Sequence, residues 1–195
     1  FATAQLGYNE FVYLDLSARN DWSSTLAYTS HEKSGFFYPS VGFSLIFNKL
    51  MTLPQWVSLA KIRGAYSMVG NDIPMFITNP SSHITAGGEF LASDAAPFKD
   101  MEPEMTHSFE AGIEARFLKN RIGLNATFYK TNTRNQFFKL PTLSGDKYAY
   151  RYVNAGDIQN VGWEISLDAV PLLTNHFKWK TEVNFSTNRK IGRAH

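Results

Sequence analysis

The sequence has no cysteine and no long apolar run, and each absence excludes a class of protein. Without cysteine among its 195 residues, the chain has no disulfide framework and no thiolate metal site. It contains no stretch of about 18 consecutive apolar residues, so the sequence predicts no transmembrane helix. An excess of one charge is also missing, because a formal net charge of +2 is too small to indicate nucleic acid as a partner.

The chain is instead rich in residues that favour strands and turns. Aromatic residues make up 15% of it, with 16 Phe and 9 Tyr, and aromatic side chains are enriched in strands. The mean hydropathy is slightly negative, as in many soluble proteins. A membrane β-barrel is compatible with that average, because only alternate residues of each of its strands face lipid.

Apolar and polar residues alternate along much of the chain, which is the pattern of a strand with two unlike faces. In residues 108–118, Phe109 and Ile113 fall on one face, whereas Glu110 and Glu114 fall on the other. The same alternation occurs in residues 2–8, 11–21, 41–47, 60–68, 121–129, 161–169 and 177–186. The sequence therefore predicts an all-β fold of about eight antiparallel strands.

Two features favour a transmembrane barrel over a soluble β-sandwich, whose strands would also alternate. First, aromatic residues lie toward the ends of the apolar faces, where aromatic girdles meet lipid headgroups. They are Phe109, Phe117, Phe128, Trp163, Phe177, Trp179 and Phe185. Second, the polar faces carry charges of both signs, as expected beside a water-filled lumen. The residues predicted to face this lumen are Asp15, Arg19, Lys61, Arg63, Glu110, Glu114, Arg116, Glu164, Asp168, Lys180 and Glu182.

The connections alternate in length, as in outer-membrane barrels with short periplasmic turns and long extracellular loops. Short connections are expected at residues 8–10, 48–58, 119–120 and 172–176, and long ones at residues 22–35, 70–106 and 140–160. We expect a helical turn at residues 53–56 and a two-residue hairpin at 119–120. Both chain ends would then lie outside the cell. A complete single-chain bacterial barrel keeps both ends in the periplasm, so residues 1–195 are expected to be a partial outer-membrane β-barrel domain, without its closing strands.

Ten short motifs follow one another along nearly the whole chain. They are residues 18–26 (ARNDWSSTL), 37–44 (FYPSVGFS), 59–66 (LAKIRGAY), 69–72 (VGND), 103–106 (PEMT), 109–117 (FEAGIEARF), 120–124 (NRIGL), 128–132 (FYKTN), 154–157 (NAGD) and 160–167 (NVGWEISL). In this order they resemble the SusC/RagA family of TonB-linked (TonB-dependent) outer-membrane transporters. Each motif alone is weak, but the ordered set is specific.

The resemblance implies a transport function in the cell outer membrane of a Gram-negative bacterium of the Bacteroidetes. It implies that the eight strands are part of a barrel of about 22 strands that imports glycans, oligosaccharides or peptides. The plug domain that such a barrel contains would lie outside residues 1–195. It also implies two protein partners, a SusD-like surface lipoprotein and TonB, the latter through parts outside this chain. It implies no cofactor.

Two other functions are open to the alternating strands alone. One is a small eight-stranded structural or adhesion barrel without a transport role, and the other is an outer-membrane hydrolase. For a glycosidase, Glu110 and Glu114 stand too far apart, at about 13 Å along one strand. Together with Arg116 they are better interpreted as a charge network of the lumen. No pair of histidines has the short spacing of a zinc site, and no convincing set of nucleophile, base and orienting residue is present.

Two further groups of residues are candidates for particular roles. Aromatic residues of the long loops can contact a substrate or the lipoprotein, since aromatic rings stack on sugars, or they can pack the loops together. They are Phe90, Phe98, Tyr148, Tyr150 and Tyr152. Glycines inside the strands indicate curvature or close approach of the backbone. They are Gly64, Gly112, Gly123 and Gly162.

Overall fold

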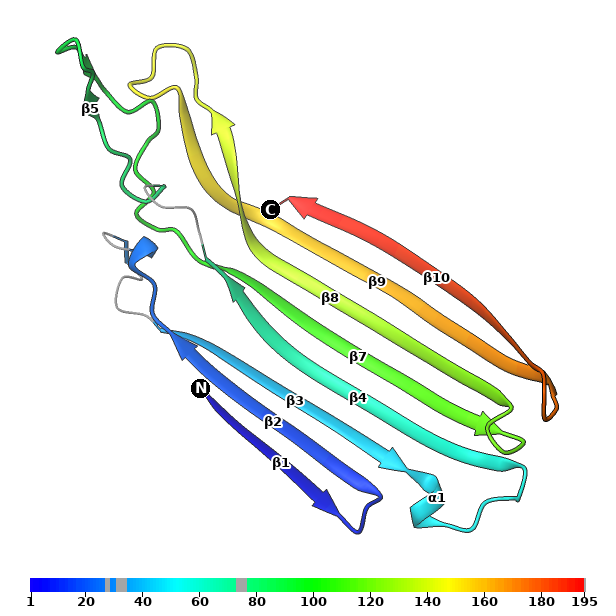
Figure 1. Cartoon of the computed structure of the whole chain (residues 1–195). Helices are drawn as coiled ribbons and strands as arrows, with labels where there is room; N and C mark the ends of the chain where they lie inside the picture. Colours follow the sequence, from blue (N-terminus) through cyan, green and yellow to red (C-terminus); the bar gives the residue numbers. More distant parts are fainter. Residues whose placement is uncertain (27–28, 31–34, 73–76, 195) are drawn as a thin grey trace.

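Eight long strands form one antiparallel sheet in the computed structural model, which describes residues 1–26, 29–30, 35–72 and 77–194. The strands are β1 (Ala2–Tyr8), β2 (Val12–Asp21), β3 (Phe36–Ile46), β4 (Val57–Asn71), β7 (Glu104–Phe117), β8 (Ile122–Pro141), β9 (Tyr150–Leu173) and β10 (Lys178–Ala194). Each pairs with the next one along the chain, in the order β1-β2-β3-β4-β7-β8-β9-β10 (Figure 1). The predicted all-β antiparallel fold of about eight strands is confirmed.

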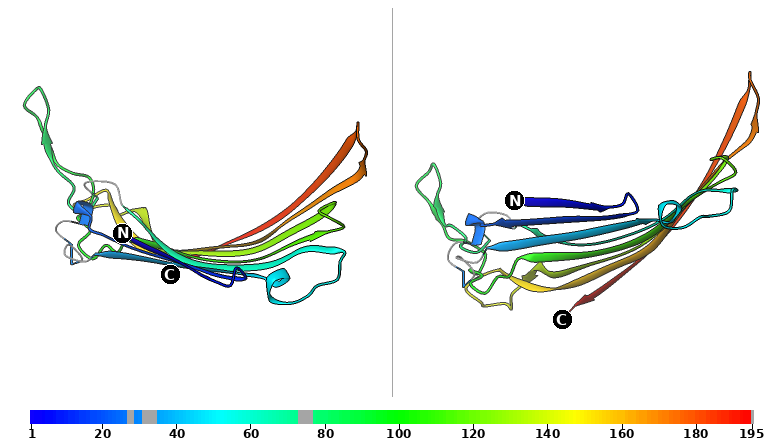
Figure 2. Two further views of the ribbon diagram at one scale, coloured as in Figure 1. Left: turned by 60° about the horizontal axis from the view of Figure 1, so that its bottom comes forward. Right: turned by 90° about the horizontal axis from the view of Figure 1, so that it is seen from below.

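The sheet is a curved, open wall whose two faces are left uncovered by the other described elements (Figure 2). Within the described residues, β1 and β10 each pair on one side only. Large apolar side chains in mid-strand are exposed, among them Phe43 at 50% and Val183 at 59%. The buried hydrophobic residues lie in or beside the long loops, and they are Leu26, Phe36, Ile77, Ala95 and Met101. The sheet therefore has no packed layer of its own on either face.

Short and long connections gather at opposite ends of the strands (Figure 1). At one end lie the turns at residues 9–11, 118–121 and 174–177 and the connection from β3 to β4, which contains helix α1 (Phe47–Leu50). At the other end lie the connections of residues 22–35, 72–103 and 142–149, which contain helix η1 (Ser24–Leu26) and the small hairpin of β5 (His83–Ile84) and β6 (Phe90–Leu91). The predicted separation of short turns from long loops is thus present, although residues 27–28, 31–34 and 73–76 of the loops lie outside the described residues.

The first short turn, at residues 9–11, contains two residues with positive φ angles. Asn9 and Glu10 of the first turn have positive φ angles of 45° and 57°, as the tight hairpin predicted there requires. Lys49 of α1 lies 2.6 Å from the Glu10 carboxylate, and this hydrogen bond and charge lower the pKa of Glu10. Both groups are exposed, so the ion pair contributes little to stability.

Two predictions about the connections are wrong. The turn expected at residues 119–120 has four residues between the strand ends, with positive φ at Leu118, Lys119 and Asn120. It widens because the Leu118 N–H leaves the hairpin and donates to the Trp56 carbonyl at 2.8 Å. The helical turn expected at residues 53–56 lies at Phe47–Leu50 instead, since Pro54 accepts a hydrogen bond in a tight turn that leads straight into β4.

Strands β8 and β9 are longer than the apolar alternation predicts. Their ladder continues through the pairs Phe138↔Val153 and Pro141↔Tyr150, so the loop between them is residues 142–149 and not 140–160. In this outer part both faces carry polar side chains, and a period-two apolar pattern is therefore absent. No helix among the described residues is long and apolar enough to cross a membrane.

The register can be tested by cysteine pairs, because the chain has no cysteine of its own. Ser40 pairs directly with Ser67, which in turn pairs with Ser108. We expect the S40C/S67C variant of the full-length protein to form a disulfide on mild oxidation, because directly paired strand residues come within bonding range. The S40C/S108C variant is the control and should stay reduced, since two strand spacings separate these residues by about 10 Å. A disulfide in S40C/S108C alone would contradict the register.

Candidate functional site

The strand register gathers polar side chains of all eight strands on one face of the sheet, here called the polar face. One row of directly paired residues consists of Thr3, Ser17, Ser40, Ser67, Ser108, Thr131, Asn160 and Lys190. The next row consists of Gln5, Asp15, Gly42, Ala65, Glu110, Tyr129, Gly162 and Asn188. All eleven charged residues predicted to share the lumen side stand at positions of this face.

The opposite face, here called the apolar face, is apolar over the same strands. Its central row consists of Tyr8, Val12, Leu45, Ile62, Ile113, Ala126, Ile165 and Phe185. A neighbouring row consists of Leu6, Leu14, Phe43, Gly64, Ala111, Phe128, Trp163 and Thr187. Because side chains alternate strictly along each strand, one register sorts both faces at once.

An ion-pair cluster on the polar face joins β7 to β9. Arg116 of β7 lies 2.7 Å from Asp168 of β9 and 3.9 Å from Glu114 on its own strand. The side chains of all three are about one-quarter to one-third exposed, so their attraction is less screened than at an open surface. The charge network predicted for this strand thus includes Glu114 and Arg116, and Asp168 completes it. Glu110 makes no ion pair in the described part of the chain.

Glycines on the polar face let long side chains reach past a neighbouring strand. The Arg116–Asp168 pair closes above Gly123 of β8, where a Cβ would overlap both partners. Tyr129 crosses Gly162 in the same way, and its hydroxyl donates to the Thr187 carbonyl at 3.4 Å. A close backbone approach of the predicted kind occurs at Gly162, next to the Thr187 carbonyl, whereas side chains of the neighbouring strands fill the space at Gly123.

Arg63 shows the same arrangement two rows away from Arg116. It passes over Gly112 of β7 and donates to Thr127 of β8 at 2.7 Å and to Asn125 at 3.3 Å. On the apolar face, the Phe43 ring lies over Gly64. The contacts made by Arg63, Arg116 and Tyr129 each join two strands that are not adjacent. Each of these bridges therefore adds a connection that the backbone ladder does not supply.

The remaining charges of the polar face are either paired locally or unpaired. Gln5 donates to Asp15 at 2.7 Å, Arg19 donates to Asp21 at 2.6 Å, and Lys180 lies 3.7 Å from Glu182. Lys61, Glu110 and Glu164 have neither an ion pair nor a side-chain hydrogen bond to any described residue. Among the eleven candidates, these three remain available to water or to a passing solute within the described part of the chain.

At the long-loop end, motifs that are far apart in the sequence meet. The Asp72 carboxylate of the VGND motif accepts hydrogen bonds from Ser23 at 2.8 Å and from Thr25 at 2.5 Å, both of the ARNDWSSTL motif. A second clamp joins the loop before β7 to β8 and β9, because Asn154 donates to the carbonyls of Glu102 and Asn135 at 2.9 Å and 2.6 Å. These contacts hold the loops to the strand ends, and no spacing in the sequence announces them.

The five aromatic candidates of the loops do not share one environment. Phe98 and Tyr152 pack against the buried cluster of Leu26, Phe36, Ile77 and Met101. Tyr150 lies between Tyr152, 6.1 Å away in an edge-to-face arrangement, and the Lys139 ammonium, 3.5 Å from its ring centre. Phe90 is 66% exposed on the β5–β6 hairpin, and Tyr148 contacts Lys147 at the tip of the loop of residues 142–149. Phe90 is therefore the most exposed of the five, and the other four are half-buried.

No group of three histidine, aspartate or glutamate side chains within the described ranges is close enough to hold a metal ion. The arrangement offers instead a long polar surface backed by an apolar one. A curved antiparallel sheet with these two faces defines a segment of the wall of a large β-barrel.

Comparisons with known proteins agree with this class. The family model described as TonB dependent receptor-like, beta-barrel matches residues 1–192. TonB-dependent receptor P39 of Formosa agariphila is 26% identical over 196 residues, which are 95% of this chain and 18% of that protein. TonB-dependent receptor SusC of Bacteroides thetaiotaomicron is 28% identical over 128 residues, which are 62% of this chain and 13% of that protein. The chain therefore belongs to the TonB-dependent receptor-like β-barrel family.

Solved structures show the same wall. A chain of the RagAB peptide importer in its open-open state superposes with a TM-score of 0.81 at 23% identity, covering 95% of this chain and 21% of that one. The siderophore receptor PirA of Pseudomonas aeruginosa superposes with a TM-score of 0.61 at 16% identity, covering 95% of this chain and 33% of that one. The chain thus spans about a fifth of the length of its SusC-like relatives, and its resemblance to the SusC/RagA transporters is confirmed.

The bridged glycines yield a prediction about stability. A Cβ at Gly162 would overlap the backbone carbonyl of Thr187, whereas one at Gly123 would overlap only the mobile ends of Arg116 and Asp168. We expect G162A to destabilise the full-length protein by about 1–3 kcal/mol, because backbone must move. G123A is the matched control and should cost less, about 1 kcal/mol, because the ends of the two partly exposed side chains can shift without movement of the backbone. Thermal unfolding in detergent measures both, and equal losses would contradict the argument.

Proposed function

We propose that this chain is a wall segment of a TonB-dependent nutrient importer in the outer membrane, with its polar face toward the lumen and its apolar face toward lipid. The observation that carries the proposal is the sorting of charge, because all eleven charged lumen candidates stand on the polar face. A barrel wall between water and hydrocarbon requires this division. Lys61, Glu110 and Glu164 would then present unpaired charge to the water of the lumen.

The aromatic residues of the apolar face support this orientation. Tyr66 and Phe109 share one row, Phe128 and Trp163 share the next row toward the short turns, and Phe185 lies one row further. Because barrel strands are tilted, residues at the same depth in the membrane lie in a different row on each successive strand. Three of the rings form a band in contact, with centroids 6.5 Å apart between Phe109 and Phe128 and 5.1 Å apart between Phe128 and Trp163.

A second aromatic contact lies at the short-turn end, where the rings of Trp56 and Phe117 stack at 5.6 Å. On β7, the eight residue steps from Phe109 to Phe117 span about 26 Å along the strand. With the tilt of about 40° that is usual in such barrels, this corresponds to roughly 20 Å along the membrane normal. The separation is close to the height of the apolar band of outer-membrane barrels.

The substrate class and the partners follow from the family resemblance and belong to the whole transporter. We infer import of oligosaccharides or peptides in a bacterium of the Bacteroidetes, without enzymatic chemistry. TonB would act through segments outside these 195 residues, and a SusD-like lipoprotein would dock on the long loops. The small structural barrel is less well supported, because β1 and β10 do not pair with each other in the described chain.

Surface labelling tests the orientation. Ser144 lies in the loop of residues 142–149, and Asn175 lies in the turn between β9 and β10. In a cysteine-free full-length protein, we expect S144C to react with a membrane-impermeant maleimide on intact cells. N175C should react only after the outer membrane is opened, because its turn would be periplasmic. The reverse pattern would overturn the proposed orientation, and unchanged nutrient uptake after deletion of the gene would overturn the transport function.

The exposed loop aromatics give a prediction about the partner. Phe90 lies on the β5–β6 hairpin with Ile84, which is 69% exposed, and Leu143 at the neighbouring loop tip is 88% exposed. We expect F90A to weaken binding of the lipoprotein about tenfold or more, as for a central aromatic of an interface, with little change in thermal stability. F98A is the contrasting variant, since Phe98 packs against the loop core, and it should increase protease cleavage of the loops. Full lipoprotein affinity in F90A would refute this contact.

A further inference from the structure

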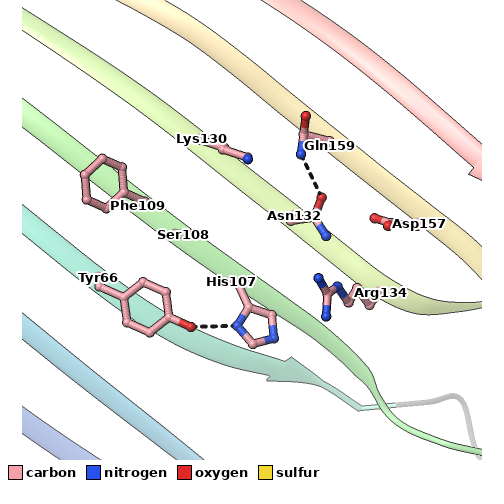
Figure 3. A pocket seen from close by; sticks show the side chains of 9 residues that line it. All are labelled: Tyr66, His107, Ser108, Phe109, Lys130, Asn132, Arg134, Asp157 and Gln159. Carbon is pink, nitrogen blue, oxygen red and sulfur yellow. Dashed lines mark hydrogen bonds between the residues drawn. The ribbon is translucent and has the colours of Figure 1, made fainter.

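The apolar face contains a hollow at its long-loop end, just beyond the aromatic band (Figure 3). Its volume is about 370 Å³. Tyr66 and Phe109 form its apolar border, and polar side chains from β7, β8 and β9 line the remainder. The hollow opens on the opposite face from the lumen candidates, so a solute inside the barrel does not reach it.

Positive charge collects around this hollow. Lys130 and Arg134 line it, are exposed, and make no ion pair with any described residue. Arg189 of β10 stands in the same row as Lys130 with Val161 between them, which places the two cations about 10 Å apart. Elsewhere the apolar face is free of charge along the central rows described above. An unpaired cluster of this kind attracts an anion carried at the membrane surface.

One polar atom of the hollow lacks a hydrogen-bond partner within the described part of the chain. One carboxylate oxygen of Asp157, Oδ1, is buried and has no hydrogen-bond partner among the described residues. A buried acceptor of this kind is stabilised by a donor such as a hydroxyl group. Asn132 accepts from Gln159 at 3.3 Å, which leaves its amide hydrogens free to donate. Toward the aromatic band, the Tyr66 hydroxyl lies 2.8 Å from His107 Nδ1.

We propose that this hollow binds the phosphorylated sugar headgroup of an outer-leaflet glycolipid. The phosphates lie against Lys130, Arg134 and Arg189, because arginine and lysine bind phosphate strongly through charge-assisted hydrogen bonds. A sugar hydroxyl donates to the unpaired oxygen of Asp157. The acyl chains begin beside Tyr66 and Phe109 and follow the apolar face. The inference rests on the proposed function in one respect, namely that the apolar face meets lipid.

The combination of groups selects a lipid over a free anion. A soluble phosphate would satisfy the cations but would leave the aromatic border and the adjoining apolar rows without an occupant. A lipid without sugar or phosphate would match the apolar face but would leave three cations and a buried carboxylate oxygen unmatched. A phosphorylated glycolipid matches all of these features together.

The full-length transporter in detergent provides the test, with diphosphorylated lipid A as the probe and dephosphorylated lipid A as its counterpart. We expect lipid A to raise the thermal unfolding temperature of the wild type in a saturable manner, and the dephosphorylated lipid to do so at concentrations at least about tenfold higher. Removal of one surface cation should weaken binding of an anionic lipid about fivefold. R189Q should show this loss, and K130Q/R134Q/R189Q should lose on the order of a hundredfold.

K190Q is the matched control, because Lys190 follows Arg189 in the chain but stands on the polar face, paired with Asn160. It should bind lipid A like the wild type. Equal binding of the phosphorylated and dephosphorylated lipids, or equal losses in R189Q and K190Q, would overturn the inference. The labelling experiment distinguishes failure of this inference from failure of the proposed function. If N175C reacts with the maleimide on intact cells, the proposed orientation is wrong, whatever the lipid measurements show.

Discussion

The backbone hydrogen bonds between neighbouring strands hold this molecule together, because the sheet has no buried core of its own. Its buried apolar residues, such as Leu26 and Met101, belong to the loops. The ladders are long, with β9 running for 24 residues and pairing with both β8 and β10. In hydrocarbon such ladders are the only way to satisfy the peptide groups of a strand. Register is therefore the property on which everything else depends, since a slip of one residue would exchange the two faces.

Side chains reinforce this ladder where glycine leaves room for them. Arg63, Arg116 and Tyr129 each extend over a glycine of the next strand and contact the strand beyond it. The bridges oppose sliding of strands past one another, because a shift in register would place a side chain where the glycine had been. They also explain how charged residues can line a wide surface without leaving every charge unpaired. Lys61, Glu110 and Glu164, which stay unpaired, are then the exceptions available for contact with solute.

The two ends of the strands have different physical roles. The short turns are compact and close the ladders with a few left-handed residues. The long-loop end has its own small core and its own clamps, in which Asp72 and Asn154 tie loops to strand ends. Rigid loops of this kind present a defined surface to other molecules, and exposed residues such as Phe90 stand on that surface. The hollow beside Lys130 adds a second surface, on the opposite face of the sheet from the eleven charged candidates.

Much of this architecture was predictable from the sequence, because side chains in a strand alternate with a period of two. That period alone identified the all-β class, the number of strands and the residues of each face, including all eleven charged lumen candidates. The ordered motifs identified the family. Prediction failed where the period disappears, as in the outer parts of β8 and β9, where both faces are polar, and in the turn at residues 118–121, where a contact to Trp56 decides the geometry.

Only the tertiary structure decided which residues on a face touch. The sequence placed Glu114 and Arg116 together, but the partner that completes their cluster, Asp168, comes from two strands away across Gly123. The sequence also did not distinguish the loop aromatics that are packed from the one that is exposed. It gave no sign that Lys130 and Arg189 share a row. The physical reason is that periodicity fixes the direction of a side chain relative to its own strand. Distances between strands depend on register, and register is set by all the ladders at once.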